Sequence, residues 1–163
     1  MNTVHPYTNN QRIIDAPHKD LRRARAAAAN IIPTTSSAIN AVIDIMPYLK
    51  GKFDGMATRV PVSDGSLIEI TALLSQNVNI ETINSCVKNA AKEQYKGIIS
   101  YTEDPLVSSD IINNPHSGIF DALSTKVLGG NFVQLVIWYD NEFAYSKRLV
   151  DLLLILGKSD GLK

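Results

Sequence analysis

The segment FVQLVIWYDNEFAYSKRLVDLLLIL, residues 132–156, decides the fold more than any other part of the chain. Its first part, 132–139, is a continuous apolar run of the kind that lies in the centre of a sheet. The part from about 142 to 156 predicts a helix that ends at Gly157. This helix is apolar nearly all round between Leu149 and Leu156, so it must be buried on more than one side. It is either a core helix or a helix that packs on a partner surface, and we favour the partner surface.

Working outward from this segment, the chain alternates short strands and helices. Ser36 or Ser37 caps a helix over 36–46, whose apolar face is Ala38, Ala41, Val42, Ile45 and Met46. Asn79 begins a second helix that continues to about Gln94. The expected strands are 1–8, 53–62, 66–74 (after a turn at Ser63-Asp64-Gly65), 97–101, 106–111, 117–122 and 124–128. Residues 9–33 form a long arginine-rich loop with a helical turn at Ala26–Ala29.

This order predicts an α+β fold, a mostly antiparallel mixed sheet with helices on one face. The length of 163 residues is that of one domain, which we assign to 1–163. With 45% apolar and 20% charged residues, the composition is that of a folded globular protein. Sixteen basic residues balance sixteen acidic ones, so no net field favours nucleic acid or a membrane. The single cysteine and the lack of a signal peptide or a membrane span predict a cytoplasmic protein without a metal site.

Several polar residues are candidates for chemistry. Arg22, Arg23, Arg25 and Arg59 predict either bidentate anion sites or a solvated basic loop. His5 is either a general base or a structural histidine, and His18 and His116 lie in turn-like contexts. Cys86 lies mid-helix near the apolar face, so we expect it to be buried and inert. The step Asp140-Asn141-Glu142 is either a plain helix cap or a holder of a ligand amide.

The order of five motifs resembles phosphorylating glyceraldehyde-3-phosphate dehydrogenase, over nearly the whole chain. These motifs are TVHPYT at 3–8, DLRRARAAA at 20–28, NIIPT at 30–34, LKGKFDGMATRVP at 49–61 and WYDNEFAYS at 138–146. The second motif is similar to bacterial and organellar members. The resemblance implies the substrate-binding, C-terminal catalytic domain of that family, which uses NAD and forms homotetramers in the cytoplasm.

The resemblance also implies a role for each matching residue. His5 matches the catalytic base that activates the nucleophile. Thr8 and Arg59 match the site for the substrate's phosphate ester, in glyceraldehyde 3-phosphate, and Arg23 with Ser36-Ser37 matches the site for inorganic phosphate. Asn141 matches the residue that orients the nicotinamide, Tyr145 lies close by, and Pro17 stands where NAD-preferring members carry proline. Residues 9–33 match a loop between subunits, so a homo-oligomer is expected.

The sequence departs from the family pattern in informative ways. Ser36-Ser37 replaces a Thr-Gly pair, Pro61-Val62-Ser63-Asp64-Gly65-Ser66 replaces P-T-x-N-V-S, and Ala144 replaces a glycine. The 163 residues contain neither the family's S-C-T-T-N-C motif nor its nucleotide-binding domain, so we expect this chain alone to be inactive and to bind NAD weakly. Two alternatives stay open: a non-catalytic oligomerisation or binding module, and part of an erythrose-4-phosphate dehydrogenase.

Overall fold

The apolar run at 132–139 forms the strand that the rest of the sheet is built around. In a computed structural model, which describes residues 1–159, this strand is β8 (Phe132–Tyr139). It pairs along its whole length with antiparallel β4 (Ser66–Leu73), from Ser66 opposite Tyr139 to Leu73 opposite Phe132. On its other side β8 pairs with β6 (Gly118–Asp121) and with β7 (Lys126–Leu128). Three neighbours make β8 the central strand, as its composition predicts.

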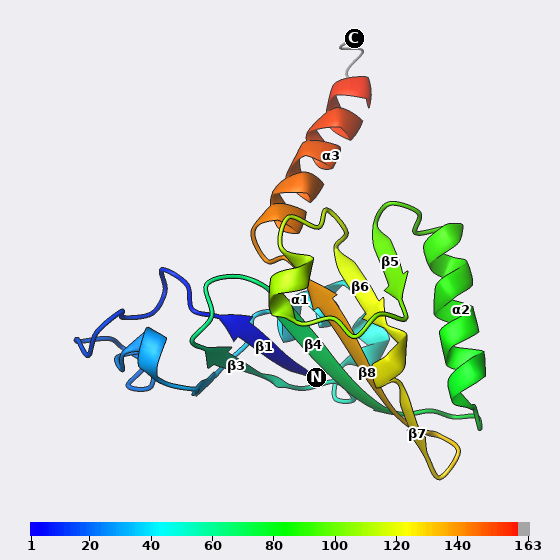
Figure 1. Ribbon diagram of the computed structural model, residues 1–163, viewed down its shortest axis with the longest axis horizontal. Helices are drawn as coiled ribbons and strands as arrows, with labels where there is room; N and C mark the ends of the chain where they lie inside the picture. Colours follow the sequence, from blue (N-terminus) through cyan, green and yellow to red (C-terminus); the bar gives the residue numbers. More distant parts are fainter. Residues whose placement is uncertain (160–163) are drawn as a thin grey trace.

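The sheet has the order β2-β3-β1-β4-β8-β6-β5, with β7 attached to β8 (Figure 1). Its remaining strands are β1 (Asn2–Pro6), β2 (Ile32–Thr34), β3 (Met56–Val60) and β5 (Ile99–Thr102). The pairs β1–β3 and β5–β6 are parallel, and the other five pairs are antiparallel. The expectation of a mostly antiparallel mixed sheet in an α+β fold is therefore confirmed.

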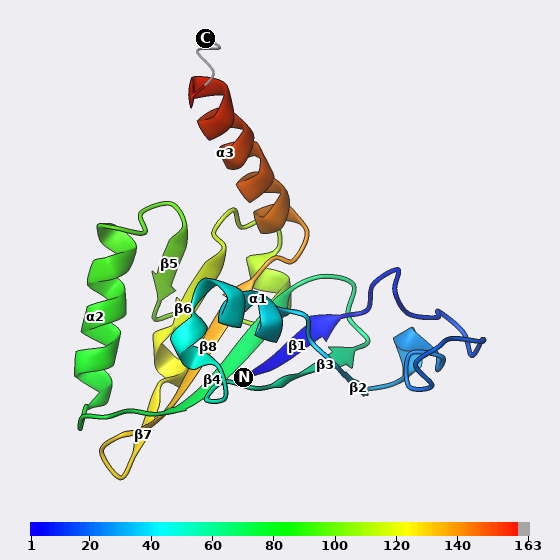
Figure 2. The ribbon, with the colours of Figure 1, turned by 180° about the vertical axis from the view of Figure 1, so that it is seen from behind.

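One row of paired residues crosses the sheet and shows which face the helices cover. The row contains Thr34, Ala57, Thr3, Ile68, Ile137, Phe120 and Tyr101, one from each strand of the main path. Paired residues share a face, because side chains alternate along a strand. The ammonium of Lys88, on α2 (Ile80–Lys92), lies 4.8 Å from the centre of the Tyr101 ring. Ala38, on α1 (Ala38–Ile45), lines one cavity with Thr3, Ala57 and Ile68. Both helices therefore cover the same face, which Figure 2 shows from the α1 side.

The two helices agree with the sequence pattern to different degrees. Asn79 caps α2 as predicted, and its side chain accepts a hydrogen bond from the backbone of Thr82 at 2.7 Å. Helix α1 exists, but its predicted apolar face is wrong. Ile39 is the buried residue, while Ile45 is 81% exposed. An eight-residue helix covers only a small area of sheet, and here Ile39 packs close to the backbone of Gly55.

Three further expectations are corrected. Residues 53–62 and 66–74 were expected to be adjacent strands, but β1 lies between β3 and β4. Residues 106–111 contain a 3-10 helix (Ser108–Ile111) in place of a strand, because Asp110 accepts a hydrogen bond from the backbone of Val107 and closes a local turn. The last helix, α3 (Phe143–Ser159), continues past Gly157, where a glycine in the right-handed conformation simply prolongs it.

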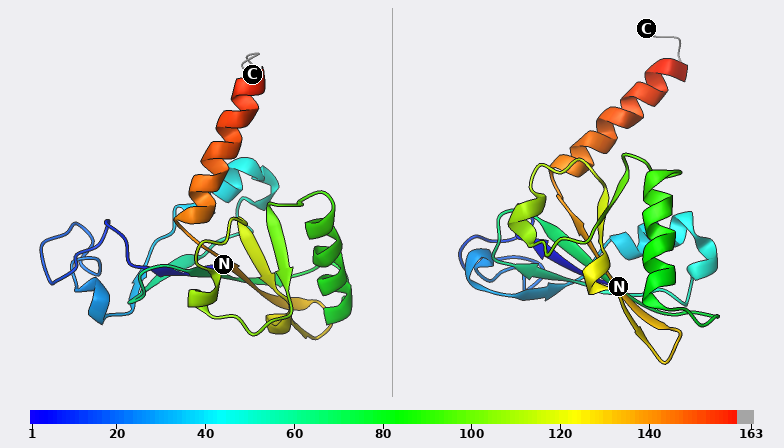
Figure 3. Two further views of the ribbon diagram at one scale, coloured as in Figure 1. Left: turned by 45° about the horizontal axis from the view of Figure 1, so that its top comes forward. Right: turned by 45° about the vertical axis from the view of Figure 1, so that its right-hand side comes forward.

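Helix α3 projects from the sheet, as the views in Figure 3 show, and its apolar side chains are exposed. The exposed fraction is 67% for Leu153 and 64% for Ile155, and Ala144 is the one buried residue in the helix as described. Nothing in residues 1–159 covers this surface, so the interpretation as a buried core helix is excluded for the described chain. None of the described helices, α3 included, combines the length and the apolar character that a membrane crossing requires.

Candidate functional site

Arg23, Arg59 and His5 line one cavity of about 460 Å³, which we call the arginine cavity. Strand β1 supplies His5 and the parallel strand β3 supplies Arg59, directly opposite it in the register. The loop before β2 supplies Arg23, and the chain entering α1 supplies the two serines. The full lining is Thr3, His5, Asn10, Arg23, Thr35, Ser36, Ser37, Ala38, Ala57, Arg59, Ile68 and Tyr139. The structure therefore brings together residues up to 136 positions apart, from Thr3 to Tyr139.

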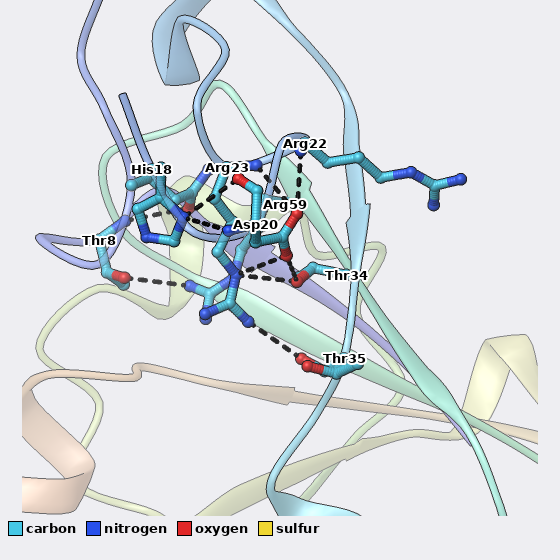
Figure 4. A network of polar contacts seen from close by, with 9 residues as sticks. Thr8, His18, Asp20, Arg22, Arg23, Thr34, Thr35 and Arg59 are labelled. Atoms are coloured by element: carbon cyan, nitrogen blue, oxygen red, sulfur yellow. Dashed lines mark hydrogen bonds and ion pairs between the residues drawn. The ribbon is translucent and has the colours of Figure 1, made fainter. Parts of the chain in front are cut away.

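The two guanidinium groups of the cavity differ in their partners (Figure 4). Arg23 donates from Nε to Thr34 at 2.8 Å and forms an ion pair with Asp20 at 3.5 Å. Arg59 donates from Nη1 to the carbonyl of Pro6 at 2.9 Å and to the hydroxyl of Thr8 at 3.5 Å. No carboxylate in residues 1–159 pairs with Arg59, and its Nε is buried without a partner. A half-buried cation without a counter-charge marks a place for an anion.

His5 lies against Arg59 and the ring of Tyr139. Its Nδ1 is 2.7 Å from Nη1 of Arg59 and 2.9 Å from the carbonyl oxygen of Pro6. The Tyr139 ring meets it edge-on, with ring centres 6.3 Å apart. Burial lowers the pKa of His5 from its ordinary value, and the charge of Arg59 lowers it further, against opposing effects of Pro6 and Glu142. The imidazole is therefore neutral near pH 7, which is the form that a general base requires.

The serines at the start of α1 leave backbone donors at the mouth of the cavity. The hydroxyl of Ser36 accepts a hydrogen bond from the backbone of Ala38 at 3.3 Å. Ser37 is the N-cap residue of α1, and its side chain forms no capping hydrogen bond. The start of α1 adds free backbone N–H groups and a favourable helix dipole to the arginine cavity, which Arg23 and Arg59 also line.

A second, smaller cavity of about 250 Å³ lies on the other side of His5, and we call it the amide cavity. Two of its lining residues, Asn141 and Tyr145, are those that the sequence predicts to contact the cofactor. The amide oxygen of Asn141 accepts from the hydroxyl of Ser66 at 2.8 Å, which fixes the side chain. Its Nδ2 donates to exposed Glu142 at 3.1 Å. The whole lining is His5, Ser117, Tyr139, Asp140, Asn141, Ala144, Tyr145 and Arg148.

In the step Asp140-Asn141-Glu142 the structure shows the helix cap, and it places the amide side chain at a cavity. Asp140 is a structural residue, 1% exposed, whose carboxylate accepts from the backbones of Asn113, Glu142 and Phe143 at 2.7–2.8 Å. It thereby caps the first turn of α3 and anchors the loop at 113. Asn141, the next residue, faces the amide cavity. A buried cap and an amide that lines a cavity therefore occupy neighbouring positions.

Not every candidate lies at these cavities. Pro17 lines a separate hollow with Asn10, Arg12, His18 and Lys19, which shares no residue with the amide cavity. Its carbonyl accepts from Nε of Arg12 at 2.9 Å. Thr8 is outside the lining of the arginine cavity and contacts it through Arg59. No group of His, Cys, Asp and Glu side chains in residues 1–159 has the arrangement of a metal site.

The expectation that Cys86 is buried is wrong, because its side chain is exposed on α2. The face of α2 toward the sheet passes through Asn84, whose Nδ2 donates to the carbonyl of Ala122 at 3.1 Å. Cys86 lies two positions further on, about 200° around the helix, and so points to solvent. The apolar neighbours Ile83 and Val87 suggested burial, and the polar contact of Asn84 decides the orientation. Cys86 lines neither cavity that contains His5.

Sequence reasoning missed two residues of the site. Tyr139 lines both cavities, and burial raises the pKa of its phenol, which stays protonated. Its position at the end of the apolar run, two residues after Ile137, was the available signal. Asp20 orients Arg23 through an ion pair and accepts from the hydroxyl of Thr34 at 3.3 Å. Its role depends on a loop conformation that no pattern in the sequence indicates.

A protein-family model accounts for most of this chain. The model described as "Glyceraldehyde 3-phosphate dehydrogenase, C-terminal domain" matches residues 1–141, which include both cavities up to Asn141. The chain belongs to the glyceraldehyde 3-phosphate dehydrogenase family. The resemblance seen in the sequence motifs is thereby confirmed.

Curated relatives in this family align with nearly all of the chain. It is 53% identical over 159 residues to the glyceraldehyde-3-phosphate dehydrogenase of Mycobacterium avium, covering 98% of this chain and 47% of that protein. It is 52% identical over 157 residues to "Glyceraldehyde-3-phosphate dehydrogenase 2" of Streptomyces avermitilis, with 96% and 47% covered. The chain therefore spans about half the length of the curated relatives it matches. These names favour neither the erythrose-4-phosphate alternative nor the stand-alone module.

Proposed function

We propose that this chain is the substrate-binding part of a phosphorylating glyceraldehyde-3-phosphate dehydrogenase, which works in glycolysis. The whole enzyme oxidises glyceraldehyde 3-phosphate with NAD and inorganic phosphate to 1,3-bisphosphoglycerate. One observation carries the proposal: Arg59 is half-buried beside His5 and Arg23 without a carboxylate partner among the described residues. A reaction with two phosphate groups near one base requires such an arrangement of cations.

The residues of the arginine cavity would divide the anionic groups between them. Arg59 and Thr8 would hold the phosphate ester of the substrate, since they already form one hydrogen-bonded pair. Arg23, Ser36 and Ser37 would hold inorganic phosphate, using the guanidinium and the helix start. His5 would act as the general base, because its lowered pKa keeps it neutral near pH 7.

The amide cavity fits one end of a nicotinamide cofactor. NAD, when bound, supplies the hydride acceptor. Asn141 would orient the carboxamide of the nicotinamide, because its own amide is already fixed by Ser66. Tyr145, 65% exposed at the edge of the cavity, would flank the ring. A volume of about 250 Å³ is below the usual range of roughly 300–1,000 Å³ for ligand sites, so this chain alone would bind NAD weakly.

The chemistry also requires a thiolate beside His5, and these 163 residues contain no such group. Their only cysteine is Cys86, which lines neither cavity. The isolated chain would therefore bind anions without turning over the aldehyde. The loop 9–33, with Ile13 and Ile14 exposed, would contact a second subunit in a homo-oligomer. We expect the enzyme in the cytoplasm, with no nucleic-acid or membrane partner.

Phosphate titration of the 163-residue chain tests the proposed anion site. Arg23→Met removes a guanidinium that lines the cavity, whereas the side chain of neighbouring Arg22 points away from it (Figure 4). Loss of a charged hydrogen bond costs about 1.5–3 kcal/mol, so Arg23→Met should weaken phosphate binding by about 10-fold or more in calorimetry. Arg22→Met is the matched control and should leave the affinity unchanged. Equal affinities for both variants would refute the anion site.

A further inference from the structure

The ring nitrogen Nδ1 of His5 lies between two groups that make opposite demands on it. Nη1 of Arg59, at 2.7 Å, can only donate a hydrogen bond. The carbonyl oxygen of Pro6, at 2.9 Å, can only accept one. A neutral imidazole satisfies one of them at a time: Nδ1 without a proton accepts from Arg59, and Nδ1–H donates to Pro6.

Arg59 decides this competition while the cavity holds no anion. Its Nη1 also donates to the carbonyl of Pro6 at 2.9 Å, so that carbonyl keeps a donor without Nδ1–H, whereas a proton on Nδ1 would face the donor Nη1 at 2.7 Å. Nδ1 is then the acceptor and the single ring proton lies on Nε2, for which no described residue provides a partner. A histidine with its proton on Nε2 cannot accept a proton there.

An anion in the arginine cavity would change the partner of Arg59. Among residues 1–159, the only side-chain oxygen that accepts a hydrogen bond from Nη1 is the hydroxyl of Thr8, at a long 3.5 Å. Burial lowers the pKa of Arg59, and the nearby charge of Arg23 lowers it further and repels the guanidinium. A bidentate anion relieves both problems, because it supplies negative charge and two acceptors. The guanidinium then turns to the anion and leaves the Pro6 carbonyl free.

We propose that an anion bound to Arg59 switches the tautomer of His5, moving the ring proton from Nε2–H to Nδ1–H. The inference rests on the anion site of the proposed function and gives Arg59 a second role, as a positioning residue for the base. The ring keeps one proton throughout: Nε2 releases a proton to solvent and Nδ1 takes one from solvent. His5 therefore becomes a proton acceptor at Nε2 only when the substrate's anionic group is in place.

The groups that face His5 from every neighbouring element are consistent with this role. Arg59 on β3 and the phenol of Tyr139 on β8 are in direct contact with the ring. Glu142, in the turn before α3, raises the pKa of His5 by its charge. Neither Tyr139 nor Glu142 forms a hydrogen bond with Nδ1 among those of the described residues, so Arg59 alone competes with Pro6 there.

The chain contains an internal reference for each tautomer, which makes the test direct. Nδ1 of His18 lies 3.1 Å from the carbonyl oxygen of Asp20, but it also accepts from the backbone N–H of that residue at 2.9 Å. Because that N–H can only donate, the proton of His18 lies on Nε2. Nδ1 of His116 donates to the Asn114 side-chain oxygen at 2.8 Å, which also accepts the backbone N–H of His116, so its proton lies on Nδ1. Nitrogen-15 NMR of histidine-labelled chain reads these tautomers side by side.

The experiment records the His5 ring nitrogens of the 163-residue chain above its pKa, with and without inorganic phosphate. Without phosphate, His5 should match the His18 pattern. Saturating phosphate should change the nitrogen-15 pattern of His5 to that of His116 and raise the pKa of His5. The tautomers of His18 and His116 should stay unchanged. Arg59→Met should show the His116 pattern without any phosphate, provided that its backbone amide spectrum is that of the folded chain.

The outcomes separate this inference from the proposed function. Phosphate that shifts the backbone amides of Thr8 and Arg59 but leaves the His5 tautomer unchanged would overturn the inference and leave the anion site intact. An unchanged His5 tautomer in Arg59→Met would overturn it as well. Phosphate that affects neither the amides nor His5 would refute the anion site and, with it, the switch.

Discussion

The arginine cavity and helix α3 are both incomplete, in opposite ways. The cavity has its polar side chains fixed by internal hydrogen bonds, yet Arg59 lacks a counter-charge among the described residues. Helix α3 is a regular helix of 17 residues, yet no other segment among residues 1–159 covers its apolar side chains. A small anion completes the first region, whereas only a large apolar surface completes the second. Exposed groups thus indicate the size of what binds: an ion for an isolated charge, a protein surface for a row of leucines.

Asp140 joins the two regions, because it follows β8 and caps α3. Its neighbour Asn141 lines the amide cavity. The direction in which α3 leaves the sheet therefore depends on the same turn that positions the site.

The first prediction tests whether the arginine cavity of the isolated chain is catalytically incomplete. We expect turnover of glyceraldehyde 3-phosphate by the isolated chain to be on the order of 10⁶-fold below that of an intact family member, because no thiol lies beside His5. NADH absorbance with aldehyde, phosphate and NAD measures it, with a full-length relative as the positive control. Turnover within about 10³-fold of that relative would contradict the proposed division of labour.

The apolar region should make the isolated chain self-associate. Replacing Leu153 and Ile155 by lysine removes two side chains that are 67% and 64% exposed in one chain. Burying both would contribute about 3–6 kcal/mol, so the double variant should associate at least about 100-fold more weakly. Sedimentation velocity over a concentration series measures this.

Leu73→Lys is the matched control for α3, since Leu73 is 75% exposed at the end of β4. It should not alter association. A wild-type chain that stays monomeric at every concentration would show that α3 needs no cover.

The turn that joins the two regions should be the most sensitive polar position for stability. Asp140→Ala leaves three backbone N–H groups, in part-buried hydrogen bonds, without their acceptor, at a cost of about 3 kcal/mol. Asp110→Ala is the control, because Asp110 accepts from one exposed backbone N–H only. Urea unfolding followed by fluorescence of Trp138 compares the two. Similar losses for both variants would argue against Asp140 as the anchor of α3.

The smallest expected effect concerns Asp64, close to the same turn. Burial raises its pKa above the ordinary 3.8, and the charges of Asp140 and Glu142 add to the shift. The folded chain therefore keeps this proton where the unfolded chain has lost it, so the contribution stabilises the fold at low pH and disappears as the pH rises through the folded-state pKa.

Asp64→Asn should consequently raise the free energy of unfolding at pH 7, by less than about 1 kcal/mol, and leave it unchanged near pH 3. Asp54→Asn is a close control, since both carboxylates accept from the backbone of a following glycine, at 2.7 Å in Asp54 and 2.8 Å in Asp64. A gain of equal size in both variants would indicate a local turn effect instead of charge repulsion.

The sequence predicted those parts of the molecule whose residues interact locally. The apolar run of β8 and the capped, periodic helix α2 were found with nearly correct bounds, because composition and hydrogen bonding at a helix end are local properties. The grouping of Arg23, Arg59 and His5 was anticipated through the family motifs. Spacing alone did not separate an anion site from a solvated basic loop.

What the sequence did not reveal depends on contacts between distant segments. The insertion of β1 between β3 and β4 is set by pairing across more than 50 residues, so the expected hairpin was wrong. The orientation of α1 and of Cys86 follows from which side chains meet the sheet: in α2, Ile83, Asn84 and Val87 are half-buried, whereas Cys86 lies off that face. Tyr139 enters the site only because the register places it in the same row as Ser66.

The position of β1 also has a kinetic consequence. His5 and Arg59 become neighbours only when the earliest strand in the sequence is inserted between two strands that lie more than 50 residues further along. Closing such a loop costs chain entropy before any hydrogen bond offsets it, and high contact order slows folding. The hairpin of β7 and β8 can form from contiguous segments, whereas β4 joins β8 across more than 50 residues and the base and its arginine must await the parallel pairing of β1 and β3. The site is therefore expected to be among the last parts of the sheet to assemble after synthesis.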